Sequence, residues 1–185
     1  MTRRWSWGRW LLLALVVAGV AHVLTVWLLP RVVMRVATST MAEREGFNRA
    51  VFPPRADETA RTIVRPSPDL LYAGCAFDVA SGPLRIQAVV PKDTYWSLSM
   101  FAANTDNFFV VNDRKAASGT VDVVLVAPGA NVALPRGATL VEAPSTRGIV
   151  LTRTLIANAD RLGELDEARR RFTCAPLAGD GSGPQ

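Results

Sequence analysis

The residues that could do chemistry in this sequence are few, and their types restrict that chemistry sharply. The only histidine is His22, in an apolar run near the N-terminus, so the rest of the chain cannot form a Ser-His-Asp or Cys-His arrangement. Two cysteines, Cys75 and Cys174, do not make a zinc site without histidine. Glycine-rich phosphate-binding motifs are absent. Catalysis would have to rest on carboxylates or an Arg-Tyr-Asp set alone. We therefore predict that the protein is not an enzyme, with no catalytic residues, no metal and no cofactor.

His22 is an ionisable group near the middle of an apolar run, which makes it a candidate for a proton relay. No carboxylate lies within the run to pair with it. A tolerated neutral imidazole, or a contact between helices, is the simpler interpretation.

The two cysteines favour a disulfide, because an even number of cysteines in an exported domain usually pairs. A bond between Cys75 and Cys174 would tie the two ends of the domain together. The alternative is two unrelated buried thiols.

A cluster of oxygen-bearing side chains occupies residues 104–107, with the sequence Asn-Thr-Asp-Asn. Such a cluster could bind Ca²⁺ or a sugar hydroxyl. A calcium loop would need more carboxylates than Asp106 alone supplies, so the pattern favours a turn whose side chains bond to their own backbone.

Arg153 is the arginine whose position is hardest to explain. In residues 148–156, alternation places it on the same face as Ile149 and Leu151, which predicts an inward-facing arginine. Because an unpaired buried charge is too costly, we predict an ion pair with Asp106 or Glu142. That pair would be structural or would lie at the mouth of a ligand pocket.

Aromatic residues could line the same pocket. Tyr95, Trp96 and Phe101 are candidates, although aromatic side chains on a core strand usually belong to the core. The candidate ligand-binding residues are Tyr95, Asn104, Asp106 and Arg153.

The element before this domain is a membrane helix. From Leu11 to Leu29 the chain carries no formal charge. As a helix this run is roughly 28 Å long, which is close to the hydrocarbon thickness of a bilayer. Pro30 is expected to stop the helix. Tryptophans flank the run on both sides, as in an interfacial aromatic belt, at Trp5, Trp7, Trp10 and Trp27.

Charge indicates the orientation of this helix. The net charge of +5 resides in residues 1–50, which hold seven arginines and two glutamates, so the rest of the chain is neutral and predicts no nucleic-acid partner. Arg3, Arg4 and Arg9 precede the run, which favours a cytoplasmic N-terminus, while Arg31 and Arg35 lie near the head groups beyond it. A cleaved signal peptide is the alternative, but residues 37–39 (Ala-Thr-Ser) make a poor cleavage site. We therefore predict an uncleaved signal-anchor.

The chain after residue 70 has the two-residue period of β-strands. Strands are expected at 71–77, 84–88, 95–101, 108–111, 121–127, 139–142 and 148–156, with turn residues between them. No segment between 70 and 156 has helical period, so the pattern favours an antiparallel sandwich or barrel. One helix, residues 160–172, closes the domain, with Asn158 or Asp160 as its N-cap. Pro53 and Pro54 mark the boundary that precedes the domain.

Several strings in this region resemble a known family. They are residues 65–72 (RPSPDLLY), 93–98 (DTYWSL), 104–109 (NTDNFF), and the elements Leu134-Pro135, 143–146 (APST) and 153–155 (RTL). In order and spacing they resemble the bacterial domain-of-unknown-function 1254 family over about residues 60–175. The resemblance implies a jelly-roll-like β-sandwich and no transferable reaction. Longer relatives carry a second domain of the 1214 family, so the chain resembles a short membrane-anchored form, and a protein of the 1214 type is a candidate partner.

The predicted fold is therefore mainly β, an antiparallel jelly-roll-like sandwich with one C-terminal helix, preceded by a transmembrane helix. The predicted parts are a cytoplasmic N-terminus (1–10), a transmembrane helix (11–29), a juxtamembrane stalk (30–55), the sandwich (56–177) and a disordered tail (178–185). We expect a single-pass protein of the bacterial inner membrane with its domain in the periplasm. Its expected role is a non-enzymatic envelope docking or assembly module. The alternative is a domain that binds a small molecule or a glycan.

Overall fold

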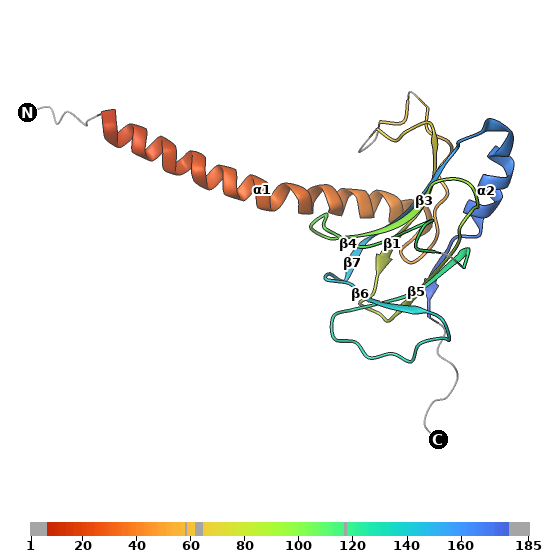
Figure 1. Ribbon diagram of the computed structural model, residues 1–185. Helices are drawn as coiled ribbons and strands as arrows, with labels where there is room; N and C mark the ends of the chain where they lie inside the picture. Colours follow the sequence, from red (N-terminus) through yellow and green to blue (C-terminus); the bar gives the residue numbers. More distant parts are fainter. Residues whose placement is uncertain (1–6, 58, 62–64, 117, 178–185) are drawn as a thin grey trace, which may run out of the picture.

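The computed structural model describes residues 7–57, 59–61, 65–116 and 118–177, in which a long helix leads into a two-layered β-sandwich (Figure 1). The elements are α1 (Trp7–Glu45), β1 (Leu70–Asp78), β2 (Leu84–Val89), β3 (Trp96–Ala102), β4 (Asn107–Asn112), β5 (Thr120–Val126), β6 (Thr139–Glu142), β7 (Arg147–Leu155), the 3₁₀ turn η1 (Ala159–Arg161), α2 (Leu162–Arg170) and β8 (Thr173–Pro176). The mainly β fold and its seven predicted strands are confirmed, and β8 is an additional strand. The predicted tail at 178–185 and the pair Arg3 and Arg4 lie outside the described residues.

The strands form two four-stranded sheets that face each other. One sheet has the order β1-β7-β3-β4 and the other β6-β5-β2-β8. All pairs are antiparallel except β5 and β6. Parallel neighbours need a crossover connection, and the long segment between these two strands supplies it.

Both faces of the first sheet are covered at β1. Its inner side chains, among them Cys75 and Phe77, lie in the core between the sheets. Its outer side includes Gly74 and Ala76, which are also buried. Helix α1 contacts β1 and β7 there, and Met41 of the helix lies against Gly74. The chain at this strand is therefore buried on both sides.

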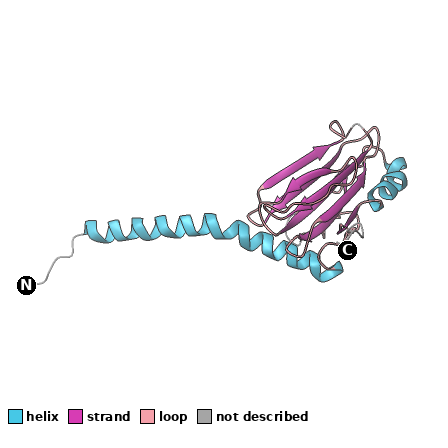
Figure 2. Cartoon of the chain, turned by 90° about the horizontal axis from the view of Figure 1, so that it is seen from below, coloured by secondary structure: helices cyan, strands magenta, loops and turns pink. Residues whose placement is uncertain are grey.

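Helix α1 continues through Pro30, so the prediction that Pro30 stops it is wrong. A proline removes one backbone hydrogen bond and crowds the preceding turn, but neighbouring packing can hold the helix together. Here the second half of α1 is held by the sheet, on which Met34 and Thr38 are buried. Figure 2 shows the last turns of α1 lying beside the strands while its first half projects away from them.

The chain turns back to the sandwich directly after α1. Gly46 follows the helix with a φ of 90°, a conformation that glycine adopts without strain, and its N–H bonds to the carbonyl oxygen of Ala42. Asn48 then exchanges two side-chain hydrogen bonds with the backbone of Asp78, at 2.7 and 2.9 Å. Val51 forms a bridge with Gly74 at the edge of β1. Asn48 and Val51, which belong to the predicted stalk, are therefore already bonded to β1.

A disulfide joins the two sheets at one side of the sandwich. Cys75 of β1 is bonded to Cys174 of β8, and both are buried. The predicted pairing is thus present, and the alternative of two separate thiols is wrong. The bond closes a loop with a sequence separation of 99 residues.

Candidate functional site

The predicted ligand-binding residues lie at two opposite ends of β3. Tyr95 precedes this strand, and Arg153 is paired with Ser97 near the same end. Asn104 and Asp106 lie in the turn that follows its other end. Seven residues of strand span roughly 20 Å. The structure therefore does not bring the four residues together in one pocket.

Arg153 faces away from the core. It does share a face of β7 with Ile149 and Leu151, as the alternation indicates, but that face is the half-buried outer one. The inward face carries Gly148 and Val150. The register places Arg153 beside Tyr72 and Ser97 on the outer side of the sheet. The prediction that it points inward is wrong, because α1 covers the outer face and both faces of β7 carry apolar residues.

The predicted ion pair of Arg153 is also absent from the described residues. Asp106 instead accepts a hydrogen bond from the side-chain amide of Asn104. Glu142 accepts one from the N–H of Gly129. Each carboxylate is used within or near its own loop.

The segment 104–107 is a turn of the predicted kind. The N–H of Asp106 donates to the side-chain oxygen of Asn104, and Thr105 has a φ of 75°. Among the described residues no group of three or more His, Cys, Asp or Glu side chains could hold a metal ion.

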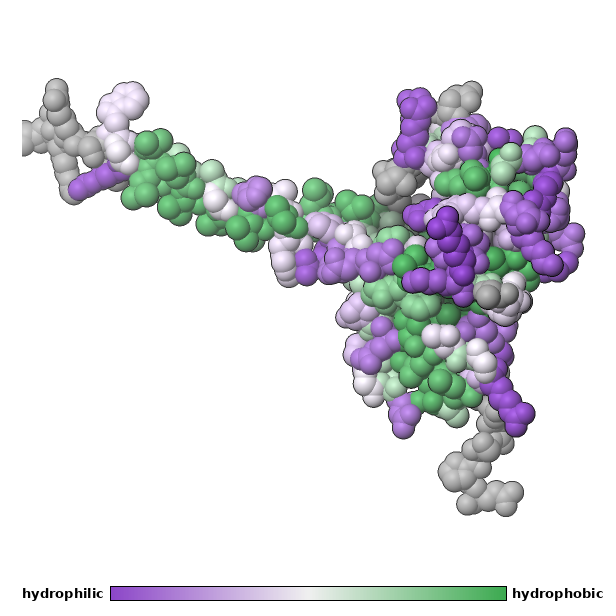
Figure 3. Space-filling model, viewed as in Figure 1, coloured by the Kyte–Doolittle hydropathy of each residue, from purple (hydrophilic) through white to green (hydrophobic). Residues whose placement is uncertain are grey.

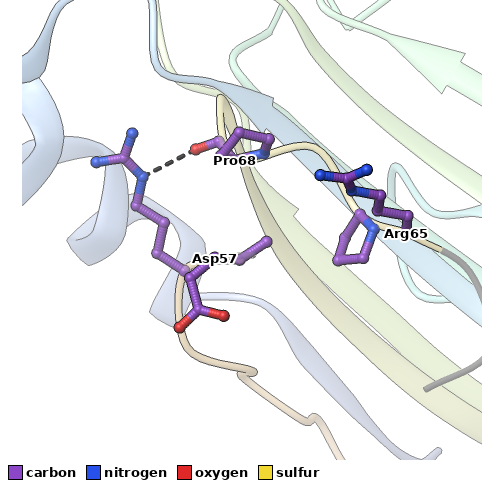
Figure 4. A pocket seen from close by; sticks show the side chains of 6 residues that line it. Asp57, Arg65 and Pro68 are labelled. Carbon is purple, nitrogen blue, oxygen red and sulfur yellow. Dashed lines mark hydrogen bonds between the residues drawn. The ribbon is translucent and has the colours of Figure 1, made fainter. Parts of the chain in front are cut away.

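The described surface includes a hollow in the loop before β1 and another beside α1. The first, of about 520 Å³, lies in the loop before β1 and is lined by Arg55, Ala56, Asp57, Arg65, Pro66 and Pro68. Figure 4 shows the Nε of Arg55 donating to the carbonyl oxygen of Pro68, at 2.8 Å. Asp57 accepts from both the hydroxyl and the N–H of Thr59, which lowers the pKa of its carboxyl. These polar groups bond within their own loop. The residues that line this hollow all belong to that loop, and no described helix or strand contributes to it.

The second hollow, of about 490 Å³, lies where α1 meets the sandwich. Its walls come from α1, from the turn after β3 and from the turn before β7. It is lined by Arg31, Met34, Arg35, Thr38, Ser39, Phe47, Ala102, Ala103, Asn104, Asp106, Pro144, Ser145, Thr146 and Arg147. Segments distant in sequence thus meet in one cavity, which sequence periodicity could not indicate.

Hydrogen bonds fix the two turns that form this cavity. The hydroxyl oxygen of Ser145 accepts from the N–H of Ala103 at 2.9 Å and donates to the carbonyl oxygen of Arg147 at 2.8 Å. The Nε of Arg147 bonds to Asp78 at 2.6 Å. Burial raises the pKa of Asp78, but the N–H of Ala80 and the Arg147 guanidinium outweigh it and hold that pKa below its ordinary value. The turns are therefore preformed.

Among the described residues the buried arginine is Arg169, which the sequence-based predictions do not include. It is 7% exposed, and its Nη1 donates to the carbonyl oxygens of Pro53 and Tyr72 at 2.8 and 2.9 Å. It also pairs with Asp166. The signal was its spacing, since Arg169 follows the buried Leu165 by four residues and therefore lies on the same helix face.

Comparisons with known proteins agree with this architecture. Residues 47–176 match the model of a family described as Protein of unknown function (DUF1254). The chain belongs to the DUF1254 family. The match begins one residue before Asn48, whose side chain bonds to the backbone of Asp78. No curated protein matches the chain.

Two solved structures show similarity to this DUF1254 chain. The crystal structure of the VPA0106 protein from Vibrio parahaemolyticus matches with a TM-score of 0.64 and 14% identity over 80% of this chain. An uncharacterized protein from Burkholderia cenocepacia matches with a TM-score of 0.45 and 21% identity over 78% of it. The chain spans 35% and 38% of the lengths of these two proteins. The fit to the Vibrio protein shows a common fold.

Proposed function

We propose that this protein is a single-pass membrane-anchored module of the bacterial cell envelope that docks another envelope protein and carries out no reaction of its own. A DUF1254 domain that follows an apolar helix fits a membrane-anchored domain of unknown activity. The apolar stretch of α1 is long enough to cross a bilayer and is exposed on all sides. Figure 3 shows this apolar surface along α1.

The observation that carries the proposal is the packing of α1 on β1 and β7. The helix runs without a break from its apolar stretch to the sandwich, where Met34 and Thr38 are buried and Met41 lies against Gly74 of β1. The sandwich is therefore held in a fixed orientation at the end of the helix. A fixed orientation suits a platform that must present one face to a partner in the same membrane.

The periplasmic side is supported by charge and by the disulfide. Arginines that precede the apolar run favour a cytoplasmic N-terminus. The Cys75–Cys174 bond needs an oxidising compartment. Both point to a sandwich on the outer side of the inner membrane.

The docking surface that fits best is the open side of the sandwich. The disulfide closes the side of β1 and β8, so the edges of β4 and β6 are on the other side. Val110 of β4 and Leu140 of β6 are 49% and 47% exposed there. Exposed apolar residues on two neighbouring strand edges suit a protein interface. We propose a protein of the 1214 type as the partner, as the family resemblance suggests.

Topology is tested by trapping the thiols in growing cells. Cells that express the full-length protein are acidified, and free thiols are then labelled with a maleimide polymer. We expect no label on the native protein and two labels after reduction. Two labels before reduction would place the sandwich in the cytoplasm and contradict the proposal.

Docking is tested by photo-crosslinking in cells that also make the 1214-type protein. A photoreactive phenylalanine analogue replaces Val110 or, separately, Leu140. The matched control is Lys92, an exposed residue of the connection between β2 and β3. We expect an adduct that contains the 1214-type protein from Val110 and Leu140 but not from Lys92. Equal adducts at all three positions, or none, would contradict docking at this side.

A further inference from the structure

We propose that the cavity between α1 and the sandwich binds the phosphate head group of an anionic membrane lipid. This inference rests on the proposed anchoring of α1 in a membrane. It assigns a ligand to a site that the DUF1254 fold forms together with the helix before it, and it is independent of protein docking at β4 and β6.

The charge of the cavity selects an anion. Three of its lining residues are arginines, Arg31, Arg35 and Arg147, and one is an aspartate, Asp106. The Asp106 carboxylate already accepts a hydrogen bond from Asn104. Guanidinium groups bind phosphate oxygens through paired N–H donors, so several of them around one cavity suit a phosphate.

The depth of the cavity matches the head-group layer. Arg31 and Arg35 follow the end of the apolar run at Leu29 by two and six residues, which is roughly 3 and 9 Å along the helix axis. The polar layer of a bilayer extends about 5–8 Å beyond the hydrocarbon on each side, so Arg31 lies within this layer and Arg35 at its outer edge. Figure 3 shows hydrophilic residues where the apolar surface of α1 ends, next to the sandwich.

Two of the three arginines are held in place by contacts on one side. The Arg31 guanidinium lies 4.0 Å above the ring of Trp27 and donates to the carbonyl oxygen of that residue at 2.6 Å. The Arg147 guanidinium lies 5.0 Å from the ring of Phe47, and its Nε bonds to Asp78. Each arginine has further N–H groups beyond those that these bonds use. The site is therefore organised before a ligand enters.

Arg35 is the residue most open to a ligand. It lies one helical turn after Arg31 on the same face of α1. Its side chain is exposed, and within the part of the chain that the structure describes it has no ion pair or side-chain hydrogen bond. Removing its charge should therefore change binding without disturbing the fold.

The apolar surface beside the cavity favours a lipid over free phosphate. Trp27 and Leu24 precede Arg31 on the same face by four and seven residues, and both are exposed. Met34, another lining residue, is apolar as well. An acyl chain can lie along this surface while its phosphate reaches the arginines. Inorganic phosphate gains nothing from it.

The test is lipid retention by the full-length protein, purified in a non-ionic detergent and measured by native mass spectrometry. Phosphatidylglycerol, phosphatidylcholine and inorganic phosphate are added separately. The variants are Arg35→Gln and the double variant Arg31→Gln/Arg35→Gln. The control is Arg114→Gln, which removes the same charge from an exposed position beyond the far end of β4.

We expect one phosphatidylglycerol per protein, retained over phosphatidylcholine. Each arginine removed from the cavity should weaken binding roughly fivefold, and Arg114→Gln should leave it unchanged. Equal retention of the two lipids, or unchanged retention in the double variant, would overturn the lipid site. Inorganic phosphate binding as tightly as phosphatidylglycerol would also overturn it, in favour of a soluble anion.

A different measurement distinguishes failure of the membrane anchoring from failure of the lipid site. Membranes from cells that express the protein are washed with alkaline carbonate. A protein released by the wash is not anchored, and the proposed function then fails together with the lipid site. A protein that stays in the membrane but retains no anionic lipid contradicts the lipid site alone.

Discussion

The guanidinium of Arg169 reaches from α2 to β1, where it donates a hydrogen bond to the carbonyl oxygen of Tyr72 at 2.9 Å. The same nitrogen bonds to the carbonyl oxygen of Pro53 at 2.8 Å. One buried side chain therefore joins the segment after α1, the first strand and the last helix. Arg169 therefore holds these three elements together.

Arg169→Ala should destabilise the sandwich by about 3 kcal/mol, because it leaves two part-buried carbonyl oxygens without this donor and removes a buried side chain. The measurement is urea-induced unfolding of the full-length protein in detergent, followed by the change in tryptophan fluorescence, of which the buried Trp96 supplies the part that reports on the sandwich. The control is Arg170→Ala, since Arg170 pairs with the same Asp166 but is 61% exposed. Arg170→Ala should lower the free energy of unfolding by less than about 1 kcal/mol. Equal effects of the two variants would contradict the structural role of Arg169.

Gly148 should not tolerate a side chain. An added Cβ would overlap the carbonyl oxygen of Phe101 and would lie 2.6 Å from the Phe77 ring. Gly148→Ala is therefore expected to cost more than about 3 kcal/mol in the same unfolding measurement. Gly163→Ala is the control: apart from its chain neighbours and the backbone of its own helix, a Cβ added there would meet no heavy atom within 4 Å, and in α2 alanine should stabilise by about 0.5–1 kcal/mol. The prediction fails if both changes are tolerated.

The disulfide should contribute strongly to stability because it closes a long loop. Replacing Cys75 and Cys174 by alanine should lower the free energy of unfolding by about 2–5 kcal/mol. The urea-unfolding midpoints of the native protein and the double alanine variant are compared at one pH. The native protein with its disulfide reduced is measured as a second reference. An unfolding midpoint that does not change in either case would show that the bond does not constrain the unfolded chain.

Asn48 should hold the end of α1 to the sandwich. Asn48→Ala removes both hydrogen bonds to the backbone of Asp78 and places alanine at a φ of 61°, which asparagine tolerates better. Tryptic cleavage after the exposed Arg49 should then accelerate by on the order of tenfold, because local opening costs less free energy. The control is Asn104→Ala, whose side-chain bonds stay within one turn. Cleavage at Arg49 that is unchanged in Asn48→Ala would contradict this role.

Asp122 should make stability depend on pH in the acid range. The Arg85 guanidinium beside it holds the pKa of its carboxyl below the ordinary value of 3.8, against a smaller opposing effect of burial. A folded-state pKa below the unfolded one gives a contribution that is present above pH 3.8 and is lost as the pH falls through the folded value.

Asp122→Asn should therefore cost about 1 kcal/mol or less at pH 7, since Arg85 is partly exposed, and nothing at a pH well below 3.8. The free energy of unfolding is measured across that range. Asp160→Asn is the control, because the described residues include no ion-pair partner for Asp160. A difference between wild type and Asp122→Asn that stays constant with pH would contradict the mechanism.

Much of the architecture follows from the sequence because it depends on local pattern. The strand at 139–142 lies where alternation and turn residues predict it, and β2 alternates between a buried and a half-buried face. Asn158 caps η1 by accepting a hydrogen bond from the N–H of Asp160. The apolar run forms part of a long helix, and the resemblance to the DUF1254 family is confirmed by residues 47–176.

Only the tertiary structure decides which arginine is buried. Arg153 and Arg169 both share a face with apolar residues, so local pattern treats them alike. The face of Arg153 is the outer side of β7, and that of Arg169 meets β1. Alternation identifies two faces of a strand but not the one that a second layer covers, and here α1 covers the face opposite the core.

The cavity between α1 and the sandwich is likewise decided by the tertiary structure. Arg31 and Arg35 lie on α1, and Arg147 follows them by more than a hundred residues. The sequence by itself determines that an apolar helix precedes a neutral β-sandwich with two cysteines. The meeting of Arg31 and Arg35 with the turns of the sandwich follows from long-range packing of α1 on the sheet, which the spacing of residues along the chain does not encode.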